Sequence, residues 1–136
     1  MTDSFVGTWI LDASQSDYQA GEPPKTAIYT IEADNDVYNI TMQWANQEDE
    51  SLSASYQAHP DGKRYSYEDS DSVDFVVMTR VDDKTLVSES IKDDKTIVWA
   101  QRKLSADDNT MQVIQRIFAP DGTQLDNISV YNRERV

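Results

Sequence analysis

The fold is decided by a stretch of seven residues, YNITMQW at positions 38–44, in which every second side chain is apolar. The stretch LSASYQA at positions 52–58 repeats this alternation. Because successive side chains of a β-strand point to opposite faces, the pattern predicts strands with one buried face and one wet face. No segment carries a helical stripe of useful length, so the sequence predicts an all-β chain.

Turn signals separate further β-rich runs. Clusters of Asp, Asn, Pro, Gly and Lys occur at 34–36, 60–62, 82–84, 93–95, 107–109 and 120–122. The runs between them predict strands at 28–32, 73–81, 85–91, 96–104, 111–118 and 125–132. An N-terminal run through Trp9 and a short piece at 64–67 raise the total to about ten. Because short connections join antiparallel neighbours, the simplest topology is an up-and-down meander.

The length of the chain, 136 residues, fits a single domain over 1–136 with one core. A meander with one apolar face must cover that face, and closure into a barrel also removes the exposed sheet edges. We therefore expect one antiparallel β-barrel of about 8–10 strands, with room inside for a ligand. The uniformly hairpin-like connections after residue 30 favour this barrel over an open sandwich.

Composition excludes several classes of function. The net charge of −13 argues against nucleic acid and anionic membrane surfaces as partners. The chain has no cysteine, so thiolate metal sites and cysteine nucleophiles are excluded. The single histidine, His59, lies in a turn that offers neither a partner nor shelter. The acidic run at 68–74 lacks the Gly and the terminal Glu of a calcium loop, so a solvated turn is favoured. We expect no metal and no cofactor.

The N-terminal residues MTDSFVG show no signal-peptide pattern, and no apolar run approaches membrane-spanning length. We expect a cytoplasmic protein, monomeric or homodimeric. A periplasmic or secreted protein from which a leader had been removed would have the same sequence.

The motif FVGTW at positions 5–9 resembles the opening strand of the calycin superfamily, the lipocalins and the fatty-acid-binding proteins. The resemblance implies that Trp9, together with Phe5, closes the barrel floor, and that Gly7 lets neighbouring backbone approach. The physical reason is that a floor needs a large flat side chain and a coiled strand needs a residue without Cβ. Trp9 is therefore expected to be structural.

The sequence is also similar to a group of small bacterial lipocalin-like proteins, through GTW at 7–9, Pro-Pro-Lys at 23–25 and Val-Tyr at 130–131. This similarity covers nearly the whole chain. It implies the fold and leaves the activity open.

Two departures from the fatty-acid-binding proteins affect the expected ligand. In that family an Arg-x-Tyr pair on the last strand holds the ligand carboxylate. Tyr131 matches the tyrosine, but Ser129 stands where the arginine would be, which argues against a fatty acid. The segment 13–24 is too short for the family's helix-pair lid and ends in Pro-Pro, so we expect an irregular loop with at most one helical turn.

The register of the last hairpin follows from Pro-Asp-Gly at 120–122, which fits a three-residue loop with Gly122 in the left-handed position. Ala119 then pairs with Thr123. Counting back predicts the facing pairs Ile117–Leu125, Gln115–Asn127, Val113–Ser129 and Met111–Tyr131 on one face, and Arg116–Asp126 and Ile114–Ile128 on the other. The Asp126 carboxylate gives Arg116 the plainer role of a surface ion pair.

By family analogy the face that carries Tyr131 looks inward. Its neutral polar residues suit a ligand with hydroxyl, carbonyl or amide groups, and they equally suit hydrogen bonds to each other or to trapped water. Inward aromatic residues are core by default, and those near the open end would contact a ligand. The candidate ligand-binding residues are Tyr131, Ser129, Asn127, Gln115, Trp44, Tyr38, Phe75 and Trp99.

The sequence thus favours binding of a small, mostly apolar molecule with neutral polar groups. One alternative is a cofactor-free cyclase or isomerase in the same cavity, with Tyr131 or Glu89 as its acid or base. Glu89, if it points inward, would be a functional carboxylate or pair with an arginine such as Arg102. Another alternative is a filled barrel that acts through its surface.

Overall fold

The protein is all-β, and the computed structural model describes residues 4–35, 37–66 and 73–134. Within these ranges one 3₁₀ turn, η1 (Ala13–Gln15), accompanies eleven strands. The strands are β1 (Gly7–Leu11), β2 (Asp17–Tyr18), β3 (Thr26–Asp34), β4 (Val37–Ala45), β5 (Ser51–Ala58), β6 (Asp61–Ser66), β7 (Phe75–Asp82), β8 (Thr85–Lys92), β9 (Lys95–Leu104), β10 (Thr110–Phe118) and β11 (Gln124–Arg133). Residue 67 of the expected short strand and residues 68–72 of the acidic run lie outside the described residues.

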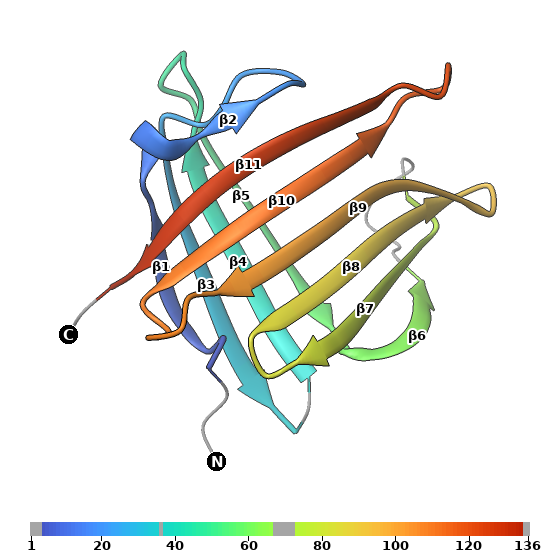
Figure 1. Ribbon diagram of the computed structural model, residues 1–136, viewed down its shortest axis with the longest axis horizontal. Coiled ribbons are helices and arrows are strands. Elements are labelled where there is room, and N and C mark those ends of the chain that lie inside the picture. The colour runs from blue at the N-terminus through green and yellow to red at the C-terminus, as the bar shows by residue number, and fades with distance from the viewer. Residues whose placement is uncertain (1–3, 36, 67–72, 135–136) are drawn as a thin grey trace.

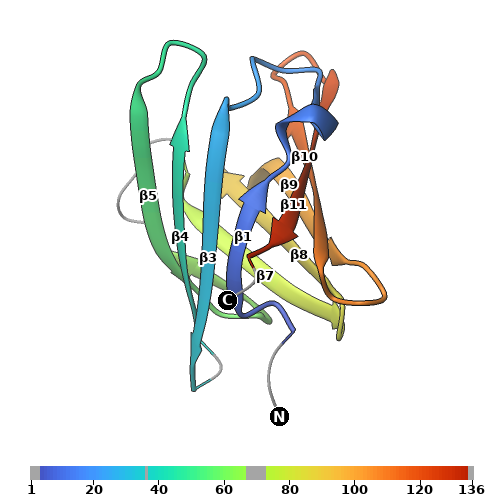
Figure 2. The same cartoon turned by 90° about the vertical axis from the view of Figure 1, so that its left-hand side faces the viewer.

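The strands form one antiparallel sheet that curls on itself. Its order is β5-β4-β3-β1-β11-β10-β9-β8-β7-β6, so the first long strand pairs with the last. In Figure 1 the strands β7 to β11 cross in front of β3 to β5, and Figure 2 shows the same two walls from the side. The ends of the order, β5 and β6, are joined by a tight turn in which the Asp61 N–H donates to the His59 carbonyl at 2.8 Å. The up-and-down barrel expected from the sequence, without a helix-pair lid, is confirmed.

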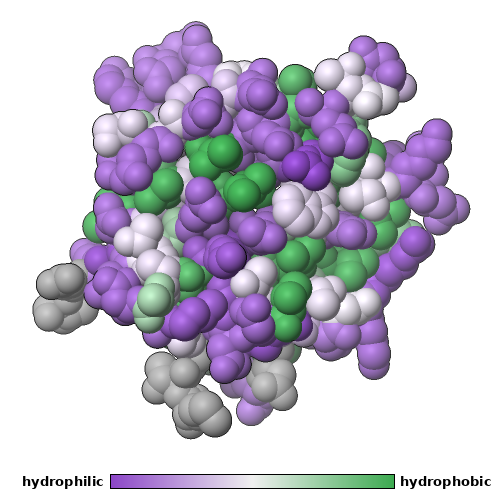
Figure 3. Space-filling model, in the orientation of Figure 1, coloured by the Kyte–Doolittle hydropathy of each residue, from purple (hydrophilic) through white to green (hydrophobic). Residues whose placement is uncertain are grey.

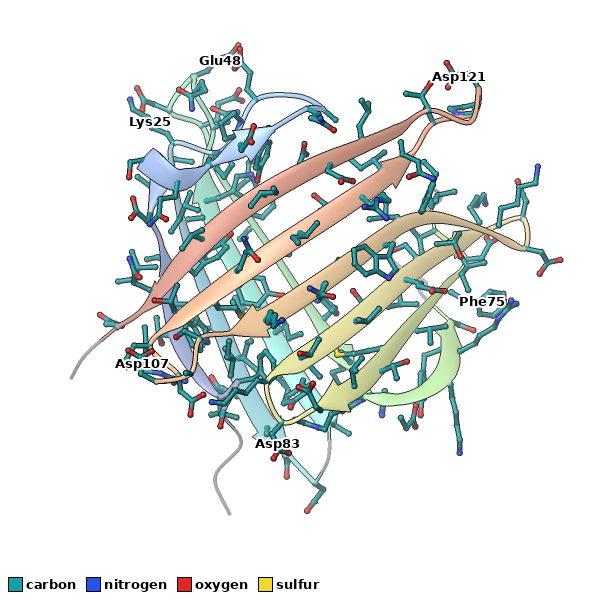
Figure 4. All side chains as sticks on the ribbon, in the orientation of Figure 1. Lys25, Glu48, Phe75, Asp83, Asp107 and Asp121 are labelled. Carbon is teal, nitrogen blue, oxygen red and sulfur yellow. The ribbon has the colours of Figure 1, made fainter. Side chains whose placement is uncertain are left out.

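The hairpin connections have the geometry that their residues predict. Asp93 and Asp94 have φ angles of 52° and 63°, as a two-residue turn between twisted strands requires. Gly122 has φ of 90°, and the Ala119 N–H donates to the Thr123 carbonyl at 2.9 Å. Figure 4 labels Asp83, Asp107 and Asp121 at three hairpin tips. The predicted register of the last hairpin is confirmed in full, including Gln115 opposite Asn127 and Met111 opposite Tyr131.

The linker between β1 and β3 is mostly irregular and holds one short helical turn, as expected. Asp12 caps η1, because its carboxylate accepts from the Ser14 N–H at 3.2 Å. The linker also contains β2, which the sequence pattern did not predict because two residues are too few to show alternation. Tyr18 of β2 pairs with Asn127 of β11. This pairing lays the linker along the last strand.

Trp9 and Phe5 are both fully buried in the hydrophobic core of the barrel. The Trp9 indole N–H donates to the Phe5 carbonyl at 3.1 Å. The Arg133 guanidinium lies 4.2 Å from the centroid of the Trp9 ring and donates to the carbonyls of Val6 and Asp108 at 2.8 and 2.9 Å. A Cβ on Gly7, whose φ is 146°, would lie 2.5 Å from the Arg133 Nη1. Gly7 is required chiefly by its backbone conformation, which other residues rarely adopt, and the group that approaches it closely is this guanidinium, not neighbouring backbone as the resemblance implied.

The outer surface is largely polar. Hydrophilic residues dominate the face shown in Figure 3, with hydrophobic residues scattered between them. The predicted ion pair on this surface is confirmed, since Arg116 contacts both carboxylate oxygens of Asp126 at 2.9 and 3.2 Å. No helix in the described part of the chain is long and apolar enough to cross a membrane.

Candidate ligand-binding site

A cavity of about 630 Å³ lies inside the curled sheet. Residues of β3, β4 and β5 line one side of it, and residues of β7 to β11 line the other. Most of its wall is apolar, with side chains such as Met42, Trp44, Val76, Met78 and Val113. Tyr18, Glu22 and Pro24 of the linker complete the wall. The volume and the apolar lining are typical of small-molecule sites.

The main charged group in the wall is Arg102 of β9, which is only 7% exposed. Its Nε donates to the Tyr29 hydroxyl at 2.7 Å, and its two terminal nitrogens donate to Ser88 Oγ at 3.3 Å and to the Tyr56 hydroxyl at 3.2 Å. The guanidinium also lies 5.4 Å from the Tyr29 ring centroid. Side chains from both walls of the barrel therefore form hydrogen bonds with Arg102.

The charge of Arg102 is not neutralised by its neighbours. Burial raises the pKa of Tyr29, so this phenol stays uncharged at neutral pH. Burial opposes the charge on Arg102, but a hydrogen bond to the Tyr29 hydroxyl favours it, and the pKa of Arg102 lies above its ordinary value, so Arg102 stays charged. Among residues 4–35, 37–66 and 73–134, no carboxylate forms an ion pair with Arg102. The cavity therefore carries a buried positive charge held by hydroxyl groups.

Tyr131 lies beside this cluster and lines the cavity. Its ring centroid is 5.8 Å from that of Tyr29. Burial, and then the proximity of Tyr18, raise the pKa of Tyr131 to about 12, against the opposing effect of Arg102. Its hydroxyl therefore keeps its proton at neutral pH and can donate a hydrogen bond.

Five of the eight candidate ligand-binding residues line the cavity: Tyr131, Ser129, Asn127, Gln115 and Trp44. Two of these five also hold the linker in place. The Asn127 side chain accepts from the N–H groups of Gln19 and Ala20 and donates to the Ala20 carbonyl, each at 3.0 Å. The Ser129 hydroxyl bonds the Tyr18 hydroxyl at 3.0 Å. Their polar groups are thus largely used by the protein itself.

The other candidates lie elsewhere. Tyr38 is buried in the core, and its hydroxyl accepts from Arg80. Trp99 sits on the outer face of β9, where the Arg116 guanidinium lies 5.4 Å from its ring centroid. Phe75, labelled in Figure 4, contacts Arg64, whose guanidinium carbon is 5.6 Å from its ring centroid. The placement of Tyr38, Phe75 and Trp99 beside a ligand is corrected, because none of them lines the cavity.

Glu89 also lies outside the cavity. It pairs with Trp99 across β8 and β9, whereas its neighbours Ser88 and Ser90 line the cavity. Successive side chains of a strand point to opposite faces, so Glu89 points outward. It does not pair with Arg102; its carboxylate accepts from the Thr96 hydroxyl at 3.4 Å. The condition for a catalytic or arginine-paired Glu89 is not met.

Sequence reasoning considered Arg102 only as a partner for Glu89 and missed its central position. A signal was present, because Arg102 stands between the apolar residues Ala100 and Leu104 on one face of its strand. Extending the register of the last hairpin by one strand places Arg102 opposite Val113 and hence on the face of Ser129. A charge on that face predicts a buried cation.

The linker attachment makes a direct prediction. In an Asn127→Ala variant the Ala20 amide loses its acceptor, so its hydrogen exchange should speed up about tenfold. The measurement is amide exchange followed by NMR. Asn132→Ala is the control, because Asn132 is exposed on the same strand and, among the described residues, its side chain accepts a hydrogen bond only from the Thr110 hydroxyl, at 3.4 Å. Unchanged protection of Ala20 in Asn127→Ala would show that Asn127 does not hold the linker.

Three solved structures share this architecture. A fatty acid binding protein of Schistosoma mansoni, solved with arachidonic acid, superposes with a TM-score of 0.63 at 19% identity, over 97% of each chain. The S-type phycobiliprotein lyase CPES of Guillardia theta gives 0.64 at 14% identity, over 98% of this chain and 90% of its own. The zebrafish ileal bile acid-binding protein, solved with cholic acid, gives 0.55 at 10% identity, over 96% of this chain and 99% of its own.

These likenesses, together with the curled antiparallel meander and the FVGTW strand, define the class of fold. The protein has the calycin fold, the barrel of the lipocalins and the fatty-acid-binding proteins. No family model matches the chain, and no curated protein sequence matches it.

Proposed function

We propose that the protein binds a small hydrophobic carboxylic acid inside its barrel, with the acid group toward Arg102 and Tyr131. The observation that carries the proposal is a buried guanidinium on the cavity wall that has no carboxylate partner among the described residues. A buried charge is costly unless it is paired. A ligand carboxylate supplies the missing pair, with the Tyr131 hydroxyl as a second donor.

The rest of the wall fits the remainder of such a molecule. Side chains such as Met42, Trp44, Val76 and Val98 give the cavity an apolar lining. Each Å² of apolar ligand surface that leaves water contributes about 25 cal/mol. The volume of about 630 Å³ leaves room for a ligand, which speaks against the filled barrel. The structural neighbours solved with arachidonic acid and with cholic acid support an acid as the ligand class.

The sequence favoured a mostly apolar ligand with neutral polar groups, and Ser129 in place of the family's arginine argued against a fatty acid. The structure supports a ligand with a negatively charged group. The position on β11 is neutral, but Arg102 on β9 places a positive charge in the same cavity. A carboxylate is therefore the better match. For the alternative of a cyclase or isomerase, Tyr131 with a pKa of about 12 is a poor base at neutral pH, and Glu89 is outside the cavity.

The test is calorimetric titration of the protein with dodecanoate and, in parallel, with its methyl ester. The two molecules share one tail and differ in charge. We expect the acid to bind at least about tenfold tighter, because charge-assisted hydrogen bonds are roughly twice as strong as neutral ones. Equal affinities would contradict the role of Arg102, and absence of binding by both would contradict the proposed function.

A further inference from the structure

The curled sheet has an edge strand at β5. The strands β5 and β6 end the strand order, and among the described residues no ladder joins them to each other. Figure 2 shows β5 as the outermost strand of its wall, with β4 beside it. An edge strand presents N–H and C=O groups to which a further strand can pair. The side of β5 that faces away from β4, here called the free edge, is therefore a surface for strand addition.

The β4–β5 hairpin shows which backbone groups reach the free edge. The Asn46 N–H donates to the Glu50 carbonyl at 3.1 Å, and such bonded pairs recur at every second residue of an antiparallel ladder. By this alternation Leu52, Ala54 and Tyr56 bond to β4. The residues between them, which are all exposed, turn their N–H and C=O groups to the free edge: Ser51, Ser53, Ser55 and Gln57. No described residue bonds these groups.

The strand β5 lacks the features by which proteins block strand addition. Edge strands commonly carry charged side chains, proline or a bulge. At the other end of the order, β6 has Lys63 and Arg64 and a register shift between Asp61 and Arg64. By contrast, β5 has no charged residue and no proline, and its register with β4 is unbroken. Because 27% of the residues of the chain are charged, an exposed edge of eight uncharged residues favours contact with another strand.

The sequence of β5 is complementary to itself in an antiparallel pair. When Ala54 lies opposite the partner's Ala54, Ser53 lies opposite the partner's Ser55, and Ser51 lies opposite the partner's Gln57. The residues that turn their backbone groups to the free edge then face one another, so all of these groups gain partners. Leu52, which is 43% exposed, lies opposite the partner's Tyr56. A symmetric contact of this kind closes with two copies.

The position of the charges is compatible with this contact. A net charge of −13 on each copy opposes association, so the contact must keep acidic groups apart. The nearest acidic residues of the chain, such as Glu50, adjoin the start of β5. Antiparallel pairing places Glu50 opposite the partner's Ala58, and the two Glu50 residues are then about 26 Å apart along the strands. This separation exceeds the screening length of about 8 Å at physiological salt.

We infer that β5 is a dimer interface, at which a second copy of this chain adds its own β5 as an antiparallel neighbour centred on Ala54. The two curled sheets then continue into each other through their edges. This interface does not involve the ligand-binding proposal, and it stands or falls independently of it.

Sedimentation equilibrium of the full chain tests the inference from low micromolar concentrations to about 100 µM. We expect the average mass to rise with concentration from 15.5 kDa toward twice that value. Ser53→Glu combined with Ser55→Glu places glutamates directly opposite each other across the interface, and like charges in such positions destabilise a strand pair. This double-glutamate variant should remain at 15.5 kDa throughout.

Two further variants separate the register from the effect of net charge. Ser53→Lys combined with Ser55→Glu places opposite charges in the same facing positions and should dimerise about fivefold more tightly than wild type. Gln112→Glu combined with Gln124→Glu adds the same charge as the double-glutamate variant, at exposed positions of β10 and β11, and should dimerise much as wild type does. Far-ultraviolet circular dichroism checks that each variant is folded.

Three results would overturn the inference. The first is wild-type protein that stays monomeric up to about 100 µM. The second is a folded double-glutamate variant that dimerises like wild type, because the interface would then lie elsewhere. The third is a lysine–glutamate variant that dimerises less than wild type, because the strands would then pair in another register. If the double-glutamate variant does not fold, the lysine–glutamate variant still decides the question.

Discussion

Replacing Arg102 by leucine is expected to weaken dodecanoate binding at least about a hundredfold. Two charge-assisted hydrogen bonds to a carboxylate, at about 1.5 kcal/mol each, correspond to that factor. Arg102 has no carboxylate partner among the described residues, so its charge is available to a ligand. The methyl ester should bind the variant as well as it binds wild type, because its head group carries no charge.

The same variant should change thermal stability little. Removing a buried charge relieves a desolvation cost, which offsets the hydrogen bonds that Tyr29, Tyr56 and Ser88 lose. A melting temperature within a few degrees of wild type, together with lost acid binding, would separate a ligand-binding role from a structural one. A large fall in melting temperature would instead make Arg102 a structural link between the two walls.

Arg116→Leu is the matched control for Arg102→Leu. Arg116 lies on the neighbouring strand but points outward and pairs with Asp126 on the surface. Its loss should leave dodecanoate affinity unchanged and change the melting temperature little, because a surface ion pair contributes little stability. Equal loss of affinity in both variants would indicate a general effect of surface charge on an acidic protein.

Replacing Trp9 by alanine is expected to lower the free energy of unfolding by about 3–5 kcal/mol. Trp9 is fully buried in the core, and its truncation leaves a void that the closely packed interior cannot readily refill. The Phe5 carbonyl also loses its indole donor, and Arg133 loses the ring on which it lies. Because a domain is stable by only about 5–15 kcal/mol, this loss is a large fraction of the total free energy of unfolding.

Urea unfolding followed by far-ultraviolet circular dichroism measures this effect. The control is Trp99→Ala, the same change on the outer face, where we expect a loss of about 1 kcal/mol from the contact with Arg116. Comparable losses in the two variants would mean that the burial of Trp9 contributes no more to stability than an outer-face contact does. If Trp9→Ala does not fold, the milder Trp9→Phe should still show a clear loss in the same assay.

Local patterns in the sequence were enough to predict the order of strands and turns. Alternation over 38–44 and 52–58 predicted strands, and the Asp-, Asn- and Gly-rich clusters predicted the hairpin turns. The Pro-Asp-Gly loop fixed the register of β10 and β11 to the residue, because a turn of known length leaves one way to pair the strands. FVGTW indicated the class of barrel before any contact was known.

Which side chains face the cavity could not be read from β7 and β8. Phe75-Val76-Val77-Met78 is apolar at every position, so its alternation carries no information on direction. On β8 the polar Ser88 and Ser90 face inward and Glu89 faces outward, which the rule of apolar residues inside cannot distinguish. A ligand cavity reverses the usual cost of an inward polar group, because a ligand or water can pair with it.

The sequence by itself therefore determined an acidic, cysteine-free, all-β meander that curls into a barrel of the calycin fold, with Trp9 in its core. Strand periodicity and turn chemistry depend on residues that are close together in the sequence, so they can be predicted from it. Only the tertiary structure decided that Arg102 meets Tyr29 and Tyr56 inside the barrel and that Asn127 holds the linker. Those contacts join residues 46 to 108 positions apart, and they exist only once the sheet has curled.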